Sequence, residues 1–156
     1  MPAVLVALLA AAAPLFAWAS EGLFGLAPCE LCLWQRAPYW VAFALALAAA
    51  LGWHRAGLLR LAGVAALASA TIAGFHLGVE FGWWPSPLAG CQAPALGPAA
   101  SLEDMMASLA PVPAKSCDEP TYLIRGLPLS MAAMNLIYGL ALAGLAWTAA
   151  RKEPAR

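Results

Sequence analysis

Four long apolar runs divide the chain, at about residues 3–19, 37–53, 58–82 and 129–149. A helix needs roughly 17 to 25 mostly apolar residues to cross a bilayer, so each run is long enough to span it. Pro14 lies inside the first run, which membrane helices tolerate, and Pro38 falls in the first turn of the second, where its missing N–H costs little. The pattern predicts an all-α membrane protein, a four-transmembrane-helix bundle that forms a single domain over residues 1–156.

The first run has a second interpretation. Ala17 and Ala19, on either side of Trp18, precede Ser20 in the A-x-A pattern of a signal-peptidase site. However, the segment has no basic start, and it is long for the apolar part of a signal peptide. We therefore expect an uncleaved first helix.

The composition agrees with a lipid environment. Hydrophobic residues make up 63% of the chain and charged residues only 10%. A soluble domain has about a quarter of its residues charged, and a domain this small cannot enclose so much apolar surface in water. The formal net charge is zero and no basic stripe exists, so a nucleic-acid partner is not expected.

The basic residues predict the orientation in the membrane. Arg55 and Arg60 lie in the break at 52–60, and the residues after the fourth run are also rich in Lys and Arg. Cytoplasmic segments carry an excess of these residues, so we expect this break and both termini in the cytoplasm. The two connecting segments at about 20–36 and 83–128 then lie outside.

The longer outer segment contains one candidate helix, at residues 101–109. Ser101 is a suitable N-cap, two acidic residues occupy the first turn, and the large apolar residues share a face. Such a helix either packs on its own loop or lies on the membrane surface. The sequence leaves both possibilities open.

Cys29 and Cys32 have the C-x-x-C spacing just before the second run. A helix N-terminus lowers the pKa of a thiol, and only a thiolate attacks a disulfide. The alternatives are a zinc site and a structural disulfide. A structural zinc site wants four ligands, and a bridge within four residues closes almost no loop, so neither alternative explains the motif well. We expect no metal.

Cys91 and Cys117 lie in the same outer part of the chain, where disulfides persist. The two can pair with each other, and taken alone such a pair would be a structural bridge in the loop. Beside a C-x-x-C on the same membrane face, exchange between the two pairs is the better interpretation, because exchange needs a mobile thiolate and an accessible disulfide.

Three ionisable residues lie near these cysteines at membrane depth, where such groups are expensive and often functional. Arg36 follows Cys32 by four residues, so on a helix the two share a face. It is either a snorkelling arginine or a cation that favours the Cys32 thiolate and polarises a quinone carbonyl. His76 and Glu80, also four apart, are either a mutually satisfied polar pair or part of a proton relay to the quinone.

The order Pro28-Cys29-x-x-Cys32, Arg36, Cys91 and Cys117 on four spans resembles the DsbB family of disulfide bond formation proteins. The resemblance covers nearly the whole chain and implies a quinone-dependent thiol oxidase of the bacterial inner membrane. Gln35 departs from it, because an acid is expected before the arginine. The polar pair of the third helix is also placed differently.

The resemblance also implies a role for each cysteine. Cys91 is expected to form a mixed disulfide with a periplasmic DsbA-like protein, and Cys117 to pair with Cys91 or, transiently, with Cys29. Cys32 is expected to react with ubiquinone or menaquinone, with Arg36 beside the quinone. The sequence does not say which quinone or partner is used.

Two other classes of protein remain as rivals. A vitamin K epoxide reductase-like oxidase shares the helices and the quinone, but in that family the loop pair precedes the C-x-x-C, whereas here Cys29 and Cys32 come first. The other rival is a four-helix membrane scaffold with two structural disulfides and no catalytic activity.

Overall fold

A computed structural model describes residues 1–88, 91, 115–123 and 126–153. The regular secondary structure of this part of the chain is helical, apart from an isolated β-bridge between Tyr122 and Ser130, so the predicted all-α fold is confirmed. Its helices are α1 (Pro2–Phe24), α2 (Glu30–Trp34), α3 (Ala37–Ala50), α4 (Arg55–Glu80) and α6 (Met131–Lys152). The helix predicted at 101–109 lies outside the described residues.

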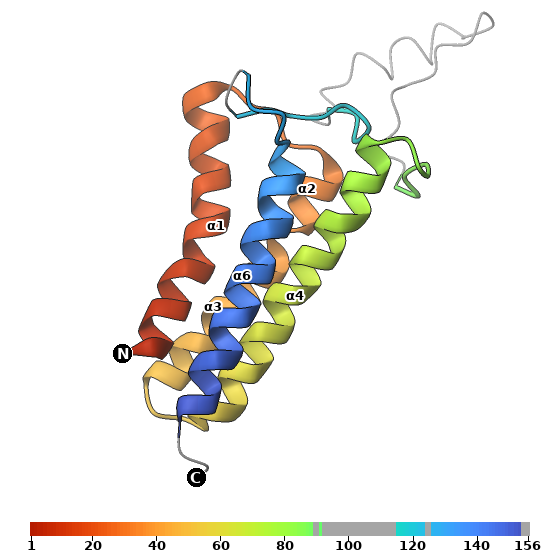
Figure 1. Ribbon diagram of the computed structural model, residues 1–156. Helices are drawn as coiled ribbons and strands as arrows, with labels where there is room; N and C mark the ends of the chain where they lie inside the picture. Colours follow the sequence, from red (N-terminus) through yellow and green to blue (C-terminus); the bar gives the residue numbers. More distant parts are fainter. Residues whose placement is uncertain (89–90, 92–114, 124–125, 154–156) are drawn as a thin grey trace, which may run out of the picture.

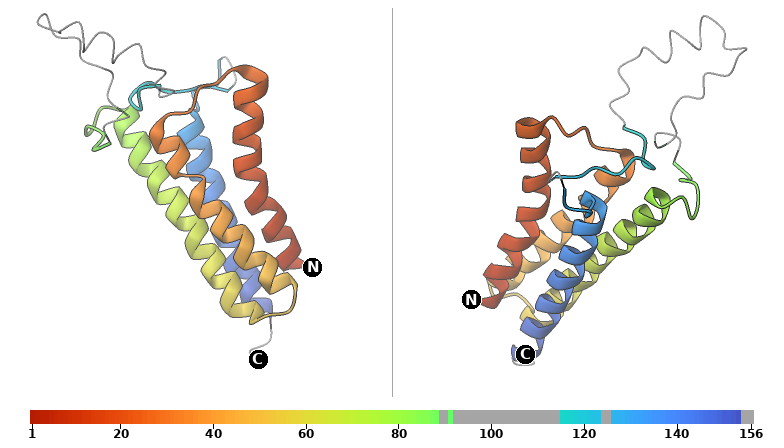
Figure 2. Two further views of the ribbon diagram at one scale, coloured as in Figure 1. Left: turned by 180° about the vertical axis from the view of Figure 1, so that it is seen from behind. Right: turned by 45° about the horizontal axis from the view of Figure 1, so that its top comes forward.

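Helices α1, α3, α4 and α6 lie side by side in one bundle and alternate in direction along the chain (Figures 1 and 2). The start of α1, the turn between α3 and α4, and the end of α6 share one end of the bundle. The short helix α2 and the segment 115–123 lie at the opposite end, which we call the α2 end. The first cysteine pair is in α2 and its N-cap, so the fold gathers the candidate chemistry at the α2 end.

Three helices in the described part of the chain, α1, α4 and α6, are long and apolar enough to cross a membrane. Helix α3 begins at the predicted place, with Pro38 in its first turn, but it ends at Ala50 and has only 14 residues. A bend at Gln35 and Arg36 joins α2 to α3, so the fourth element is a bent helix. Together these elements make a multi-pass membrane protein.

The end of α1 and the start of α4 differ from the prediction. Helix α1 continues past Ser20, which we had assigned to a connecting segment. The Ser20 hydroxyl donates to the Ala17 carbonyl, so its hydrogen-bonding need is met within the helix. The helix ends only where Gly25 takes a left-handed conformation, with φ of 64°. The third apolar run was predicted to start at 58, whereas α4 already begins at Arg55, and the chain reverses around Gly52, at φ 102°.

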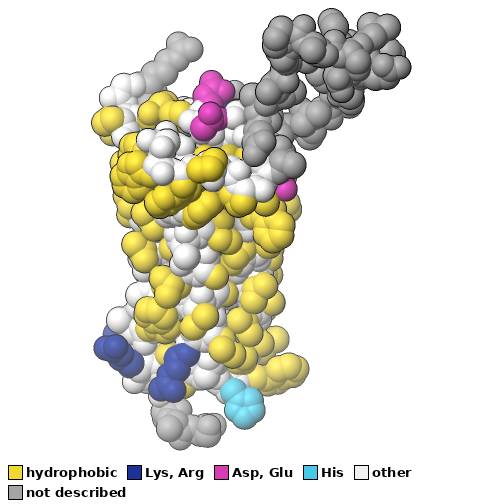
Figure 3. Space-filling model, turned by 90° about the vertical axis from the view of Figure 1, so that its right-hand side faces the viewer, with side chains coloured by type: hydrophobic (Ala, Val, Ile, Leu, Met, Phe, Trp, Pro, Cys, Tyr) yellow, Lys and Arg dark blue, Asp and Glu magenta, His cyan; other side chains and the backbone are white. Residues whose placement is uncertain are grey.

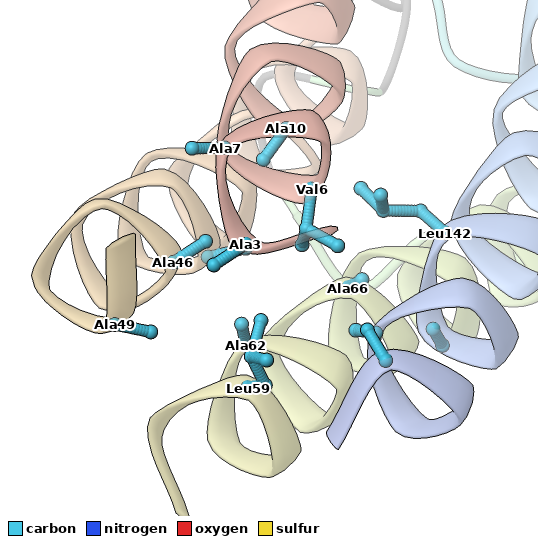
Figure 4. Packing of buried hydrophobic residues seen from close by; sticks show 14 of the residues in the cluster. Ala3, Val6, Ala7, Ala10, Ala46, Ala49, Leu59, Ala62, Ala66 and Leu142 are labelled. Carbon is cyan, nitrogen blue, oxygen red and sulfur yellow. The ribbon is translucent and has the colours of Figure 1, made fainter. Parts of the chain in front are cut away.

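Small residues fill the core, and large apolar residues cover the outside. Ala3 of α1 lies beside Ala46 of α3 in the close-up of Figure 4, and Ala7, Ala10 and Ala49 belong to the same buried cluster. At Gly139 a Cβ atom would lie 3.0 Å from Ala70 Cβ, so α6 and α4 pack very closely. Small residues at helix contacts, with large apolar residues facing outward, are typical of membrane bundles.

Charged side chains gather at the two ends of the bundle. On the face in Figure 3, a broad hydrophobic band separates basic side chains at the end where α6 finishes from acidic side chains at the α2 end. Trp18, Trp34 and Trp83 are all more than half exposed, and they come from segments near the α2 end. Exposed tryptophans flanking an apolar band mark a membrane interface.

Candidate active site

The two cysteine pairs meet at the α2 end. A disulfide joins Cys91 to Cys117, which settles the pairing that the sequence left open, whereas Cys29 and Cys32 are free thiols. Cys29, Cys91 and Cys117 are buried in one cluster that also contains Val79 of α4. The Sγ atoms of Cys29 and Cys117 lie within 4.8 Å of each other, which brings the two pairs within reach of direct exchange.

The C-x-x-C pair is built on the first turn of α2. Cys29 is the N-cap, and its sulfur accepts a hydrogen bond from the Cys32 backbone N–H at 3.2 Å. The two Sγ atoms are 2.6 Å apart. A thiol donating from Cys29 to Cys32 lowers the pKa of Cys32, and the Arg36 charge lowers it further. The same hydrogen bond, together with burial, raises the pKa of Cys29 well above its ordinary value.

Backbone and side-chain hydrogen bonds fix the second pair. The Cys91 carbonyl accepts from the Cys117 N–H at 3.2 Å and from the Ser116 hydroxyl at 3.0 Å. The Lys115 ammonium donates to Thr121 Oγ1 at 2.8 Å, and the Thr121 carbonyl accepts from the N–H of Met131, the first residue of α6. The start of α6 therefore anchors the segment that carries Cys117.

A cavity of about 480 Å³ lies on the other side of the C-x-x-C pair. Its walls come from α1, from the bend between α2 and α3, and from the first two turns of α6. The lining residues are mostly apolar: Leu9, Ala12, Ala13, Pro14, Phe16, Ala17, Cys32, Gln35, Arg36, Tyr39, Met131, Ala132, Met134, Asn135 and Tyr138. Apolar walls with a few convergent polar groups are typical of sites for small organic molecules.

Arg36 is the charged group of this cavity. It stands at the bend, where it is the N-cap residue of α3, and its guanidinium Nη2 donates to Glu21 of α1 in an ion pair. Its Nε and Nη1 atoms are buried without a hydrogen-bond partner. In the described part of the chain, these are the buried side-chain nitrogen and oxygen atoms that lack one. A buried donor without a partner is costly. Because Arg36 is among the residues that line the cavity, its guanidinium is suited to an acceptor bound there.

A chain of hydrogen-bonded polar side chains leads from the cavity back to Cys29. Tyr39 donates to Asn135 Oδ1 at 2.7 Å, and Asn135 Nδ2 donates to Gln35 Oε1 at 2.6 Å. The Gln35 amide nitrogen lies 2.9 Å from His76 Nδ1. The second ring nitrogen, His76 Nε2, lies 3.6 Å from Cys29 Sγ.

His76 and Glu80, predicted as a polar pair or a proton relay to the quinone, are not among the residues that line the cavity. They do face one another, with 3.9 Å between His76 Nε2 and Glu80 Oε1. Glu80 accepts a hydrogen bond from Ser130, the N-cap of α6, at 2.5 Å. Glu80 therefore ties the end of α4 to the start of α6.

The structure adds residues that the sequence did not single out. Glu21 lies in the connecting segment predicted at about 20–36. The predicted apolar runs contain Tyr39, Asn135 and Tyr138. Asn135 carried a usable signal, because a side-chain amide within a membrane run is expensive unless it has partners. Nothing in the local sequence pairs Glu21 with Arg36.

Cys29, His76 and Cys117 are close enough to be considered as metal ligands, with their donor atoms within 4.8 Å of one another. The Cys117 sulfur is bonded to Cys91, however, and a disulfide sulfur offers no thiolate. While that disulfide is intact, this cluster supplies two of the four ligands that a structural zinc site needs.

A helical membrane bundle with two adjoining cysteine pairs defines the class of membrane thiol oxidoreductases. The family model described as disulfide bond formation protein DsbB matches residues 1–149, and the chain belongs to the DsbB family. No curated protein and no solved structure is significantly similar to this chain. Family membership assigns the chain to disulfide bond formation.

Proposed function

We propose that this chain is a quinone-dependent thiol oxidase of the bacterial inner membrane, which reoxidises a periplasmic DsbA-like protein. The observation that carries the proposal is the position of the C-x-x-C pair between the Cys91–Cys117 disulfide and the cavity. Cys29 lies within 4.8 Å of the Cys117 sulfur, while Cys32 lines the cavity that contains Arg36. Electrons that enter at one pair therefore have a short path to the other.

In this proposal α1, α3, α4 and α6 form a single domain of four spans with both termini in the cytoplasm. Helix α3 alone is short for a span, and α2 and the turn after Ala50 extend it toward the two surfaces. The Lys and Arg residues at the end opposite α2 support this orientation. The cysteines then face the periplasm.

The reaction begins with thiol–disulfide exchange. A thiolate of the partner attacks Cys91 and releases Cys117 as a thiolate, and the partner's second thiol then frees Cys91. Cys117 attacks Cys29, which breaks the Cys29–Cys32 disulfide and releases Cys32 as a thiolate. Finally Cys91 attacks Cys117 and releases Cys29. The partner has lost two electrons and two protons, and Cys29 and Cys32 are reduced, the state that the structure shows.

Side chains of the site stabilise each new charge. The Cys32 thiolate accepts a hydrogen bond from the Cys29 thiol and is close enough to Arg36 for its charge to act on it. The unpartnered Nε and Nη1 atoms of Arg36 fit the carbonyl oxygen of a quinone, and the apolar cavity fits its ring. A quinone bound there would supply the two-electron acceptor that returns Cys29 and Cys32 to a disulfide.

The test is turnover by the purified chain in detergent. A reduced periplasmic thioredoxin-like protein is the electron donor, and ubiquinone or menaquinone is added or left out. We expect catalytic turnover that requires quinone and that is lost in Cys32→Ser and in Cys29→Ser. Oxidation of at most two thiol pairs per chain, unaffected by quinone, would instead show two stable structural disulfides.

A further inference from the structure

His76 contacts the cysteines directly. Its Nε2 lies 3.6 Å from Cys29 Sγ and 3.2 Å from the Cys117 carbonyl oxygen, and the residue is only 3% exposed. It therefore stands at the junction of the two cysteine pairs and is not among the residues that line the cavity. The proposed exchange steps among the four cysteines do not use His76.

The hydrogen bonds of its neighbours determine which ring nitrogen carries the proton. Tyr39 donates to Asn135 Oδ1, so the Asn135 amide nitrogen faces Gln35 Oε1. The Gln35 amide nitrogen then faces His76 and donates to Nδ1. A neutral imidazole that accepts at Nδ1 carries its proton on Nε2. Nε2–H consequently points at Cys29 and Cys117 as a donor.

We propose that His76 is a catalytic residue of the exchange between the two cysteine pairs, donating a hydrogen bond from Nε2 to the Cys29 sulfur as it leaves. The inference rests on the proposed function. In this step the Cys91 thiolate attacks Cys117, the Cys91–Cys117 bond forms and the Cys29–Cys117 bond breaks. The electron pair of the broken bond goes to Cys29, which then takes up the proton that Cys91 had released.

The surroundings of His76 fit donation. The Cys29 sulfur already accepts the Cys32 N–H, so His76 is a second donor to the same atom. A fixed donor is worth more in a buried site than in water. Glu80 also faces the ring, 3.9 Å from Nε2, and its carboxylate accepts from Ser130, while the charge of Lys115 acts on the ring as well.

Two substitutions separate donation from proton acceptance. In His76→Gln the amide nitrogen can replace Nε2–H and the amide oxygen can accept from Gln35, whereas His76→Leu removes the donor. Quinone-free protein is mixed with one equivalent of the reduced partner, quenched with acid and alkylated, and the free thiols are mapped over time. Free Cys29 reports the exchange, and free Cys91 and Cys117 report the preceding step.

We expect His76→Leu to slow the appearance of free Cys29 about ten- to a hundredfold, the worth of a hydrogen bond to a charged group. His76→Gln should stay within about threefold of the unsubstituted chain. The step before exchange should be unchanged in both, which also serves as the folding control. A normal rate in His76→Leu overturns the proposal, and so does a His76→Gln rate as low as that of His76→Leu.

A second measurement needs no substitution at His76. The chain has two histidines, so nitrogen-15 NMR of histidine-labelled protein gives two ring systems, and His54→Gln assigns them. We expect His76 to be neutral with its proton on Nε2, and a proton on Nδ1 overturns the proposal. Failure of the proposed function is distinct, because it would appear as absent quinone-dependent turnover in the unsubstituted chain.

Discussion

Arg36 at the start of α3 forms an ion pair with Glu21 near the end of α1, and Arg36 lines the cavity beside Cys32. Glu21 holds one terminal nitrogen of the guanidinium, and the remaining nitrogens are buried without a hydrogen-bond partner. The relationship joins two helices that the chain connects only through the segment after Gly25.

Replacing Arg36 by Met should raise the KM for a quinone about ten- to a hundredfold, because a buried donor to an acceptor in the cavity is lost. Glu21→Gln keeps a hydrogen-bonding partner but removes the negative charge, so its KM should rise less, by about threefold. Steady-state kinetics with a soluble ubiquinone analogue measure both values.

The matched control is Arg55→Gln. Arg55 also forms an ion pair, 3.7 Å from Glu153, but at the opposite end of the bundle and with its side chain half exposed. A surface pair of this kind contributes little, so the KM should not change. Equal effects of Arg36→Met and Arg55→Gln would contradict a specific role for Arg36.

The sequence predicted the helices well, because long apolar runs depend only on local composition. It did not predict the end of α1, since Ser20 and Glu21 look like a polar connection in the sequence. Within the fold Ser20 bonds to its own helix, and Glu21 finds its partner in a distant segment. A pairing of this kind depends on how the helices pack, and hydropathy contains no information about it.

The candidate site shows the same limit. The sequence grouped the cysteines, Arg36, His76 and Glu80 by spacing, and the structure brings all of them to the α2 end. Spacing paired His76 with Glu80, but Gln35 and Asn135, from two other helical segments, decide how the imidazole is oriented. Long-range hydrogen bonds of this kind appear only once α4 and α6 are packed together.

The distance between Cys29 and Cys117 predicts a specific cross-link. In the double variant Cys32→Ser, Cys91→Ser these two cysteines remain, with sulfurs that lie within 4.8 Å in the native structure. The thiol-oxidising reagent diamide should join them rapidly, because a small side-chain rotation brings them to bonding distance. Mass spectrometry before and after alkylation measures the loss of the two thiols.

The control for this cross-link is Cys29→Ser, Cys91→Ser, which leaves Cys32 and Cys117. Cys32 lines the cavity on the far side of the C-x-x-C pair, so its oxidation should be slower. If the control forms its disulfide as fast as the first variant, the proposed order of exchange through Cys29 is wrong.

Ser130 should contribute to stability through two hydrogen bonds. Its hydroxyl caps α6 by accepting the Ala133 N–H at 3.2 Å and also donates to Glu80. Loss of such a cap costs about 1 kcal/mol, so Ser130→Ala should lower the free energy of unfolding in detergent by about 1–2 kcal/mol. Thr148→Ala, which removes an exposed hydroxyl from the same helix, should change it little.

The two thiols of the C-x-x-C pair should differ strongly in reactivity. Hydrogen bonding from Cys29, and then the Arg36 charge, lower the pKa of Cys32 below its ordinary value of 9.0, whereas the pKa of Cys29 is raised above it. Only the thiolate reacts with iodoacetamide. As pH rises, the alkylation of Cys32 should therefore reach its half-maximal rate below pH 9.0, while Cys29 stays unreactive throughout.

The cause can be tested by substitution. Cys29→Ala removes the hydrogen bond from the Cys29 thiol and should move the midpoint for Cys32 to higher pH, and Arg36→Met, which removes the nearby charge, should move it in the same direction by a smaller amount. Alkylation is followed by mass spectrometry with the Cys91–Cys117 disulfide left intact. A midpoint unaffected by Cys29→Ala would show that the hydrogen bond between the two thiols does not set the reactivity of Cys32, and the Cys32 thiolate would then need another source of stabilisation.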